Sequence, residues 1–110
     1  MNNREQLLKD FTKEVQLAMG DVINKIILYG SYARGDFHVN SDIDIMILTS
    51  LTEDKIKNIE DQVYDIAFEY QMSDAITISV NIKNTEQYYY WLGALPYYDN
   101  IEREGIVLAG

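Results

Sequence analysis

The stretch LYGSYARGDFHVNSDIDIMIL, residues 28–48, joins two apolar segments through a glycine-flanked turn. The first segment stops at Gly30-Ser31, and the second carries Asp42 and Asp44 between isoleucines. Burying a carboxylate within an apolar strand costs free energy unless a cation or hydrogen bonds compensate for it. These two aspartates therefore raise the question of what they bind.

The composition limits the classes of protein that the chain can represent. Its 110 residues predict a single domain, residues 1–110, with one core. A hydrophobic content of 47% with 25% charged residues is typical of a soluble globular fold. The absence of cysteine excludes a disulfide scaffold and a thiolate metal site. A charged N-terminal segment and the lack of a long apolar segment predict a cytoplasmic protein without a membrane span.

The charge balance argues against long nucleic acid as a partner. The formal net charge is -9, and the nine basic residues are scattered along the chain. Binding to a nucleic-acid backbone depends on Lys and Arg, because they release counterions from the phosphates. Arg34 is the only Lys or Arg within residues 28–48. A small anion that is carried with metal ions remains compatible with this charge.

The periodicity of apolar residues predicts a small sheet with helices. Helical spacing is found over residues 3–19 and 51–72, and two further helices are expected from Thr85 and from Pro96. Strands are predicted over residues 22–29, 42–48 and 75–83, with a short final strand over 105–109. Each of the three main strands has a strongly apolar face. We therefore expect an α+β fold, in which a small mixed β-sheet carries helices on one face and the aspartates on its polar face.

The spacing of the aspartates suits a metal ion. Side chains at i and i+2 of a strand point the same way, with Cα atoms roughly 6.5 Å apart. Two such carboxylates can hold Mg²⁺, which prefers oxygen ligands and often takes substrate phosphates as additional ones. Taken alone, the two aspartates have a simpler explanation, in which one caps a turn and the other is solvated at the end of a strand. However, Gly30-Ser31 directly follows a strand, and a glycine there lets a phosphate approach the backbone.

At this point the sequence resembles a known superfamily. The pattern Gly30-Ser31…Ala33-Arg34-Gly35…Ser41-Asp42-Ile43-Asp44 is similar to the signature of the DNA polymerase beta-type nucleotidyltransferases. More narrowly, it resembles the minimal nucleotidyltransferase (MNT) domains of bacteria and archaea. The strong motif covers residues 28–48, and a weaker likeness covers nearly the whole chain.

The resemblance implies roles for individual residues. Asp42 and Asp44 would be the catalytic metal ligands for Mg²⁺ or Mn²⁺, and Gly30 and Ser31 would hold the β- and γ-phosphates of ATP. Arg34 would either pair with a phosphate or neutralise the surrounding acids, and both readings stay open. Two further residues are expected to have local roles only, Ser41 in capping the turn before the strand and His38 as an exposed loop residue.

The sequence departs from the family pattern at one position. The full site of the family has a third carboxylate on a neighbouring strand, often regarded as the base for the attacking hydroxyl. Here the polar face of the third strand reads Thr77, Ser79 and Asn81. Asp74 precedes this strand and would need an unusual register to reach the metals. Metal and nucleotide binding are compatible with two aspartates, whereas deprotonation of an acceptor is in doubt.

MNT proteins that resemble this chain are commonly paired with a HEPN-domain toxin. The resemblance thus implies an antitoxin that transfers AMP from ATP to a tyrosine of that toxin. Two alternatives remain: a non-catalytic nucleotide-binding antitoxin that acts by occupancy, and a subunit of a small-molecule nucleotidyltransferase.

The C-terminal part of the chain is rich in aromatic residues. Tyr88, Leu92 and Leu95 are predicted to face the core, but the remaining rings exceed what one small core can bury. They form either a thick cap on the sheet or a protein interface, where tyrosine and tryptophan are enriched. Base stacking is a third role for these rings, and the negative charge of the chain disfavours it. The six rings in question are Tyr88, Tyr89, Tyr90, Trp91, Tyr97 and Tyr98.

Overall fold

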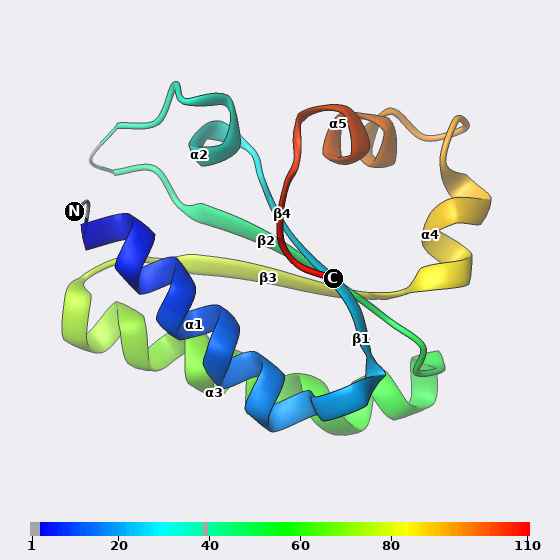
Figure 1. Ribbon diagram of the computed structural model, residues 1–110, viewed down its shortest axis with the longest axis horizontal. Coiled ribbons are helices and arrows are strands. Elements are labelled where there is room, and N and C mark those ends of the chain that lie inside the picture. The colour runs from blue at the N-terminus through cyan, green and yellow to red at the C-terminus, as the bar shows by residue number, and fades with distance from the viewer. Residues whose placement is uncertain (1–2, 39) are drawn as a thin grey trace.

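The computed structural model describes residues 3–38 and 40–110 (Figure 1). The α-helices are α1 (Asn3–Met19), α2 (Ser31–Arg34), α3 (Glu53–Asp74), α4 (Thr85–Trp91) and α5 (Pro96–Glu104). A short 3-10 helix, η1 (Gly20–Val22), follows α1. The strands are β1 (Ile23–Tyr29), β2 (Ile43–Thr49), β3 (Ile78–Asn84) and β4 (Ile106–Ala109). All of the elements predicted from the sequence are present, with ends that differ by up to three residues.

The four strands form one mixed sheet in the order β3-β2-β1-β4. β1 runs antiparallel to both β2 and β4, whereas β2 and β3 run parallel. The α+β class and the mixed sheet are therefore confirmed. The long α3 makes the crossover that a parallel β2–β3 pair requires.

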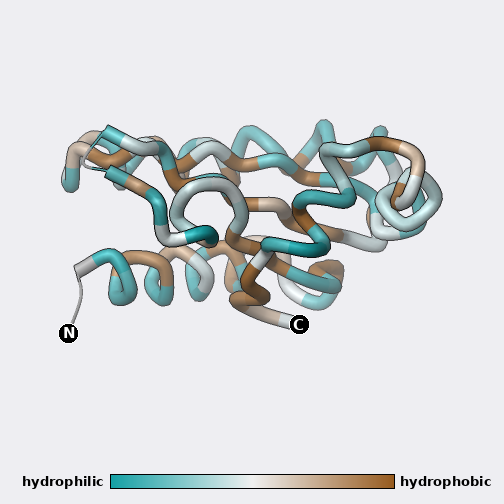
Figure 2. Tube along the Cα trace, turned by 90° about the horizontal axis from the view of Figure 1, so that it is seen from above, coloured by the Kyte–Doolittle hydropathy of each residue, from teal (hydrophilic) through white to brown (hydrophobic). Residues whose placement is uncertain are grey.

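The main core lies between the sheet and the two long helices. α1 and α3 lie side by side beneath the sheet in Figure 1. Hydrophilic and hydrophobic residues alternate along the helices (Figure 2). This pattern is expected where each helix turns one stripe toward the sheet. The fully buried residues of this core include Phe11, Val15, Ile45, Ile47 and Val63.

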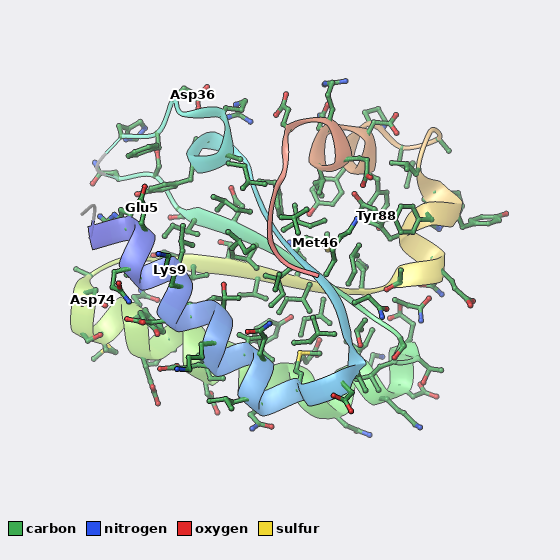
Figure 3. All side chains as sticks on the ribbon, in the orientation of Figure 1. Glu5, Lys9, Asp36, Met46, Asp74 and Tyr88 are labelled. Carbon is green, nitrogen blue, oxygen red and sulfur yellow. The ribbon has the colours of Figure 1, made fainter. Side chains whose placement is uncertain are left out.

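The expectation that helices cover only one face was wrong. A second, smaller core on the opposite face lies beneath α4 and α5; it consists of Ile27, Met46, Leu48, Tyr88 and Ile101. Figure 3 shows Met46 in the middle of the sheet and Tyr88 projecting from α4. Strict alternation along β2 assigned Met46 to a polar face. However, a continuous apolar run such as Ile45–Leu48 is typical of a strand that is buried on both faces.

This second layer covers only part of the polar face. Met46 and Leu48 are fully buried, Asp44 is half-buried and Asp42 is exposed. The end of the sheet near the two aspartates is therefore accessible, next to α2 and α5. In the described ranges 3–38 and 40–110, the helices are too short or too polar to span a bilayer.

Candidate active site

Both aspartates lie at the accessible end of β2. Asp44 pairs with Tyr29 of β1 on one side and with Ser79 of β3 on the other. Asp42 lies two residues before Asp44 and on the same face. The polar pair therefore lies at one end of a central strand, where the strands on both sides can supply further groups.

The Gly30 turn brings the backbone against one of these carboxylates. Gly30 has φ +74°, a conformation that residues with a side chain rarely adopt. A Cβ atom added at Gly30 would collide with the Asp44 carboxylate. Glycine is thus required here both for the turn and for the close approach. The two halves of the motif, separated by ten residues, meet at this contact.

The electrostatic environment of Asp44 disfavours its charged form. Burial raises its pKa above the ordinary value, the nearby Asp42 raises it further, and Arg34 opposes both effects. A protonated Asp44 therefore favours folding below its ordinary pKa, and this contribution is lost as the pH rises through the raised pKa. At neutral pH the charged carboxylate is held at a cost to stability. Such a cost is characteristic of residues that are kept for function.

Arg34 pairs with acids in the structure. Its Nε atom lies 3.2 Å from Asp36 Oδ2, and its Nη1 atom lies 3.4 Å from Glu104 Oε2. These ion pairs agree with the neutralisation of neighbouring acids, and the reading in which Arg34 pairs with a phosphate stays a prediction. The pair with Glu104 also joins the end of α2 to the end of α5.

The loop between α2 and β2 has the expected local contacts. The Ser41 hydroxyl accepts a hydrogen bond from the His38 backbone N–H at 2.9 Å, as a turn cap does. His38 itself is exposed. The structure agrees with both predictions for this loop, which are Ser41 as a turn cap and His38 as an exposed residue.

The third strand supplies no carboxylate to the site. The register places Ser79 beside Asp44 and Asn81 beside Met46. Asp74 is the last residue of α3 and lines a hollow with Asp10 of α1 on the other side of the sheet (Figure 3). Within residues 3–38 and 40–110, no group of three or more His, Cys, Asp or Glu side chains is arranged to hold a metal ion.

Three further polar groups converge on the sheet beside Asp44. The Tyr29 hydroxyl lies 2.8 Å from the Tyr97 hydroxyl, and the Asn81 amide donates to both, at 3.0 and 3.3 Å. Burial and the hydrogen bond with Tyr29 raise the pKa of Tyr97, and Asp44 contributes as well. Tyr97 is therefore a neutral phenol at neutral pH. Local sequence patterns did not predict this network, because its members lie 16 to 68 residues apart.

The aromatic residues divide between the cap and the surface. Tyr88 is fully buried and donates to Glu102 at 2.8 Å, which agrees with the prediction for Tyr88. Leu92 is half-buried, whereas Leu95 is 41% exposed, so its assignment to the core was wrong. Leu95 lies between α4 and α5, directly before Pro96, which begins α5. The exposed side chains, here called the aromatic surface, are Tyr89, Tyr90, Trp91, Leu95 and Tyr97.

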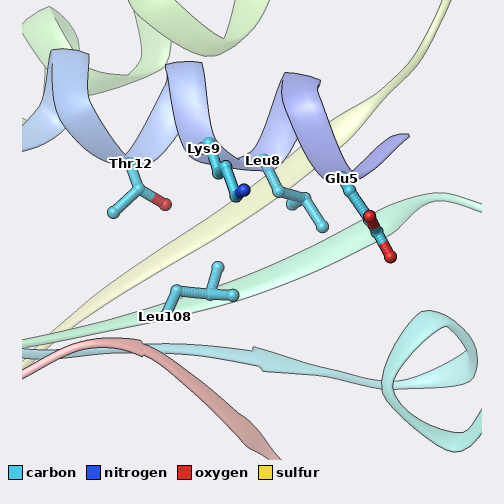
Figure 4. A pocket seen from close by; sticks show the side chains of 5 residues that line it. All are labelled: Glu5, Leu8, Lys9, Thr12 and Leu108. Carbon is cyan, nitrogen blue, oxygen red and sulfur yellow. The ribbon is translucent and has the colours of Figure 1, made fainter. Parts of the chain in front are cut away.

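A separate pocket of about 380 Å³ lies on the α1 side of the sheet (Figure 4). It lies between α1 and β4 and is lined by Leu8, Thr12 and Leu108 together with Glu5 and Lys9. The buried Thr12 hydroxyl has no hydrogen-bond partner among the described residues. This pocket lies on the opposite face from Asp44, and it therefore takes no part in the candidate site.

The residues at the aspartate pair fit a metal ion that arrives with a phosphate. Asp42 and Asp44 offer the oxygen ligands that Mg²⁺ prefers. Two carboxylates fill only part of an octahedral shell, so substrate and water must provide the remaining ligands. The Asp44 carboxylate occupies the position that a side chain at Gly30 would need.

Comparison with known proteins agrees with this geometry. The family model described as a nucleotidyltransferase domain matches residues 4–105. A relative from Methanocaldococcus jannaschii, named "Putative protein adenylyltransferase MJ0141", is 34% identical over 74 residues, which is 67% of this chain and 73% of the relative. "Putative protein adenylyltransferase MJ0604" from the same organism is 30% identical over 106 residues, which is 96% of this chain and 98% of the relative.

Two solved structures have a similar fold. A crystal structure of a toxin-antitoxin with AMP-PNP has a TM-score of 0.56 and 22% identity, and covers 93% of this chain and 73% of that chain. A mutant of the toxin-antitoxin MntA-HpeT has a TM-score of 0.55 and 20% identity, with the same coverage. The family match spans nearly the whole chain and includes both halves of the Gly-Ser and Asp-x-Asp motif. The chain therefore belongs to the nucleotidyltransferase domain family.

Proposed function

We propose that this protein is a cytoplasmic antitoxin that transfers AMP from ATP to a tyrosine of a HEPN toxin. The observation that carries the proposal is the contact between Gly30 and the Asp44 carboxylate. This contact brings the Gly30 turn, to which the proposal assigns the phosphates, next to the carboxylates to which it assigns the metal ion. A nucleoside triphosphate with its Mg²⁺ needs both of these features in one place.

Each residue of the site has a distinct task in this proposal. Asp42 and Asp44 hold Mg²⁺ or Mn²⁺ together with the phosphates of the substrate. The bound metal would supply charge neutralisation at the departing pyrophosphate. Gly30 lets the β- and γ-phosphates reach the backbone, and Ser31 donates a hydrogen bond from its hydroxyl. Arg34 stays with Asp36 and Glu104, and it reduces the negative charge that the triphosphate meets.

The relatives and the surface support a protein as the acceptor. Both M. jannaschii relatives carry the name protein adenylyltransferase, and the two structural neighbours are toxin-antitoxin assemblies. The aromatic surface offers exposed rings of the kind that are enriched in protein interfaces. It lies on α4, α5 and the turn between them, on the same side of the sheet as the aspartates. A toxin bound there could present a tyrosine to the site.

A second function is favoured by the missing third carboxylate. Without a base on β3, the protein could bind a nucleotide and block the toxin by occupancy alone. This non-catalytic antitoxin would need the same metal and phosphate contacts. The two functions differ only in whether AMP reaches the acceptor.

A transfer assay separates these functions. The protein is incubated with Mg²⁺, ATP labelled on its α-phosphate and a HEPN-domain toxin. We expect label on a tyrosine of the HEPN protein, located by peptide mass spectrometry, and none when EDTA is added. A complex that forms but stays unlabelled at saturating ATP would contradict transfer and support occupancy.

A further inference from the structure

A row of large apolar side chains lies on the outer face of α3. Tyr64, Phe68 and Met72 are 41%, 57% and 72% exposed. They are spaced four residues apart in the helix, so their side chains lie one above the other. The residues of α3 that are buried in the main core, such as Val63 and Ala67, lie on a different face of the helix. We call the three exposed side chains the α3 ridge.

The α3 ridge is separate from the surfaces described above. In Figure 1, α3 lies beneath the sheet and α5 lies above it. The Asp44 carboxylate and the aromatic surface are on the side of α4 and α5. Single exposed apolar residues are common in proteins, whereas a continuous apolar row with a polar border is typical of an interaction surface. A partner that covers the ridge would leave the candidate active site open.

Acidic side chains border the α3 ridge. Asp61 and Glu69 are exposed on α3. Glu60 accepts a hydrogen bond from the Tyr64 hydroxyl at 3.5 Å. Residues 58–82 contain five Asp or Glu residues and no Lys or Arg. Burial and the charges of Glu60 and Asp61 raise the pKa of Tyr64, so the negative potential extends over the ridge itself.

The spacing of the α3 ridge favours a helix as its occupant. Side chains four residues apart form a ridge that is inclined to the helix axis, and such ridges pack into the grooves of a second helix. Amphipathic helices that dock in this way present apolar residues at i, i+3, i+4 and i+7. An extended strand, whose side chains repeat every second residue, does not match this spacing.

The charge around the α3 ridge selects the kind of helix that fits. A second copy of this chain would bring the same acidic residues face to face, and like charges across an interface are repelled. Nucleic acids and anionic lipid surfaces are negatively charged as well. A helix with Lys or Arg on its flanks would instead pair these cations with the acids, while its apolar side chains cover the ridge.

We propose that the α3 ridge binds a helix of a partner protein, one that carries apolar side chains along its centre and Lys or Arg on both flanks. Phe68 and Met72, the most exposed members of the ridge, are the apolar anchors, and Asp61 and Glu69 pair with the cations. This interface goes beyond the proposed function, because it involves neither the nucleotide nor the aromatic surface. It gives the protein a second contact surface, on the face of the sheet that carries α1 and α3.

Binding to two synthetic peptides tests this proposal. Both peptides form amphipathic helices of about five turns with the same leucines, and they differ only in carrying Lys or Glu on the flanks. Fluorescence anisotropy of the labelled peptides measures their dissociation constants for the full chain. We expect the native protein to bind the Lys peptide about 10-fold more tightly than the Glu peptide, or better.

Substitutions in α3 locate the binding surface. Phe68→Ser and Met72→Ser alter exposed side chains, so the fold is expected to persist. Each is expected to weaken binding of the Lys peptide about 10-fold, because covering a side chain of this size contributes on that order. Asp61→Lys together with Glu69→Lys should reverse the preference, so that the Glu peptide binds more tightly than the Lys peptide.

Two controls exclude a general attraction between the peptides and the protein. Tyr90→Ser removes a ring that is 76% exposed on the aromatic surface, and it should leave both dissociation constants unchanged. Asp21→Lys together with Glu86→Lys changes the net charge by the same amount at exposed positions outside α3. This variant should keep the preference for the Lys peptide.

Three results would overturn the proposal. Equal binding of the two peptides by the native protein, or binding of neither, would exclude a basic helix as the occupant. Unchanged binding by both Phe68→Ser and Met72→Ser would show that the peptide contacts another surface. A native dimer in sedimentation that Phe68→Ser dissociates would show that a second copy covers the ridge. The peptide assay contains no nucleotide, so the proposed function is tested separately from this interface.

Discussion

Replacing Asp42 and Asp44 together by asparagine is expected to lower AMP transfer by on the order of 10³-fold or more. Loss of a single group that stabilises charge in a transition state typically costs about 10² to 10³ in rate. Here both metal ligands are lost at once, while the shape of the side chains is kept. The rate of labelled AMP transfer to the toxin measures the effect.

Stability serves as the internal control for this variant. Because burial and Asp42 raise the pKa of Asp44, its ionisation opposes folding at neutral pH. Asparagine at both positions removes that repulsion, so the melting temperature should stay equal or rise. Asp65→Asn, which removes a charge from the exposed side of α3, should leave transfer unchanged. Undiminished transfer in the double variant would show that these aspartates do not hold the metal.

Installing a carboxylate at Ser79 is expected to accelerate transfer about 10²-fold. A phenol has a pKa near 10, so an acceptor tyrosine is protonated at neutral pH and gains from a general base. Such a base is typically worth about 10² to 10⁴ in rate. Ser79 is the register partner of Asp44, and adjacent strands lie about 4.8 Å apart. Ser79→Asp therefore puts a carboxylate next to the metal ligands.

The neighbouring position on β3 supplies a matched control. Asn81 is paired with Met46, and its amide already donates to Tyr29 and Tyr97. Asn81→Asp adds the same charge but removes these donors, so no acceleration is expected. Ser79→Asn introduces a side chain with the shape of aspartate but without its charge, and it therefore tests whether the charge is needed. Rates are compared at matched ATP occupancy. Fast native transfer that Ser79→Asp does not improve would assign the base to the partner protein.

Local sequence patterns predicted the elements of the fold well. The alternation in β3 identified the two faces of that strand, and the glycine after β1 identified the turn. The strand register was not predictable, because pairing depends on contacts between distant segments. For this reason the sequence did not show which of Ser79 and Asn81 lies closer to the aspartates. The register of the structure places Ser79 beside Asp44.

The second cover of the sheet does have a signal in the sequence. Ile45, Met46, Ile47 and Leu48 form an unbroken apolar run, which is typical of burial on both faces. The ion pair that joins α2 to α5 has no such signal. Glu104 approaches Arg34 across 70 residues, so only the tertiary fold brings them together.

The proposed function depends above all on Gly30, Asp42 and Asp44 forming a site for a nucleoside triphosphate with its metal ion. Titration of the native protein with ATP in a calorimeter, first with Mg²⁺ and then with EDTA, measures this binding without any acceptor. We expect binding that depends on Mg²⁺ and that is lost both in EDTA and in the variant carrying Asp42→Asn with Asp44→Asn. Equal ATP binding without metal, or in that variant, would contradict the assignment of these residues.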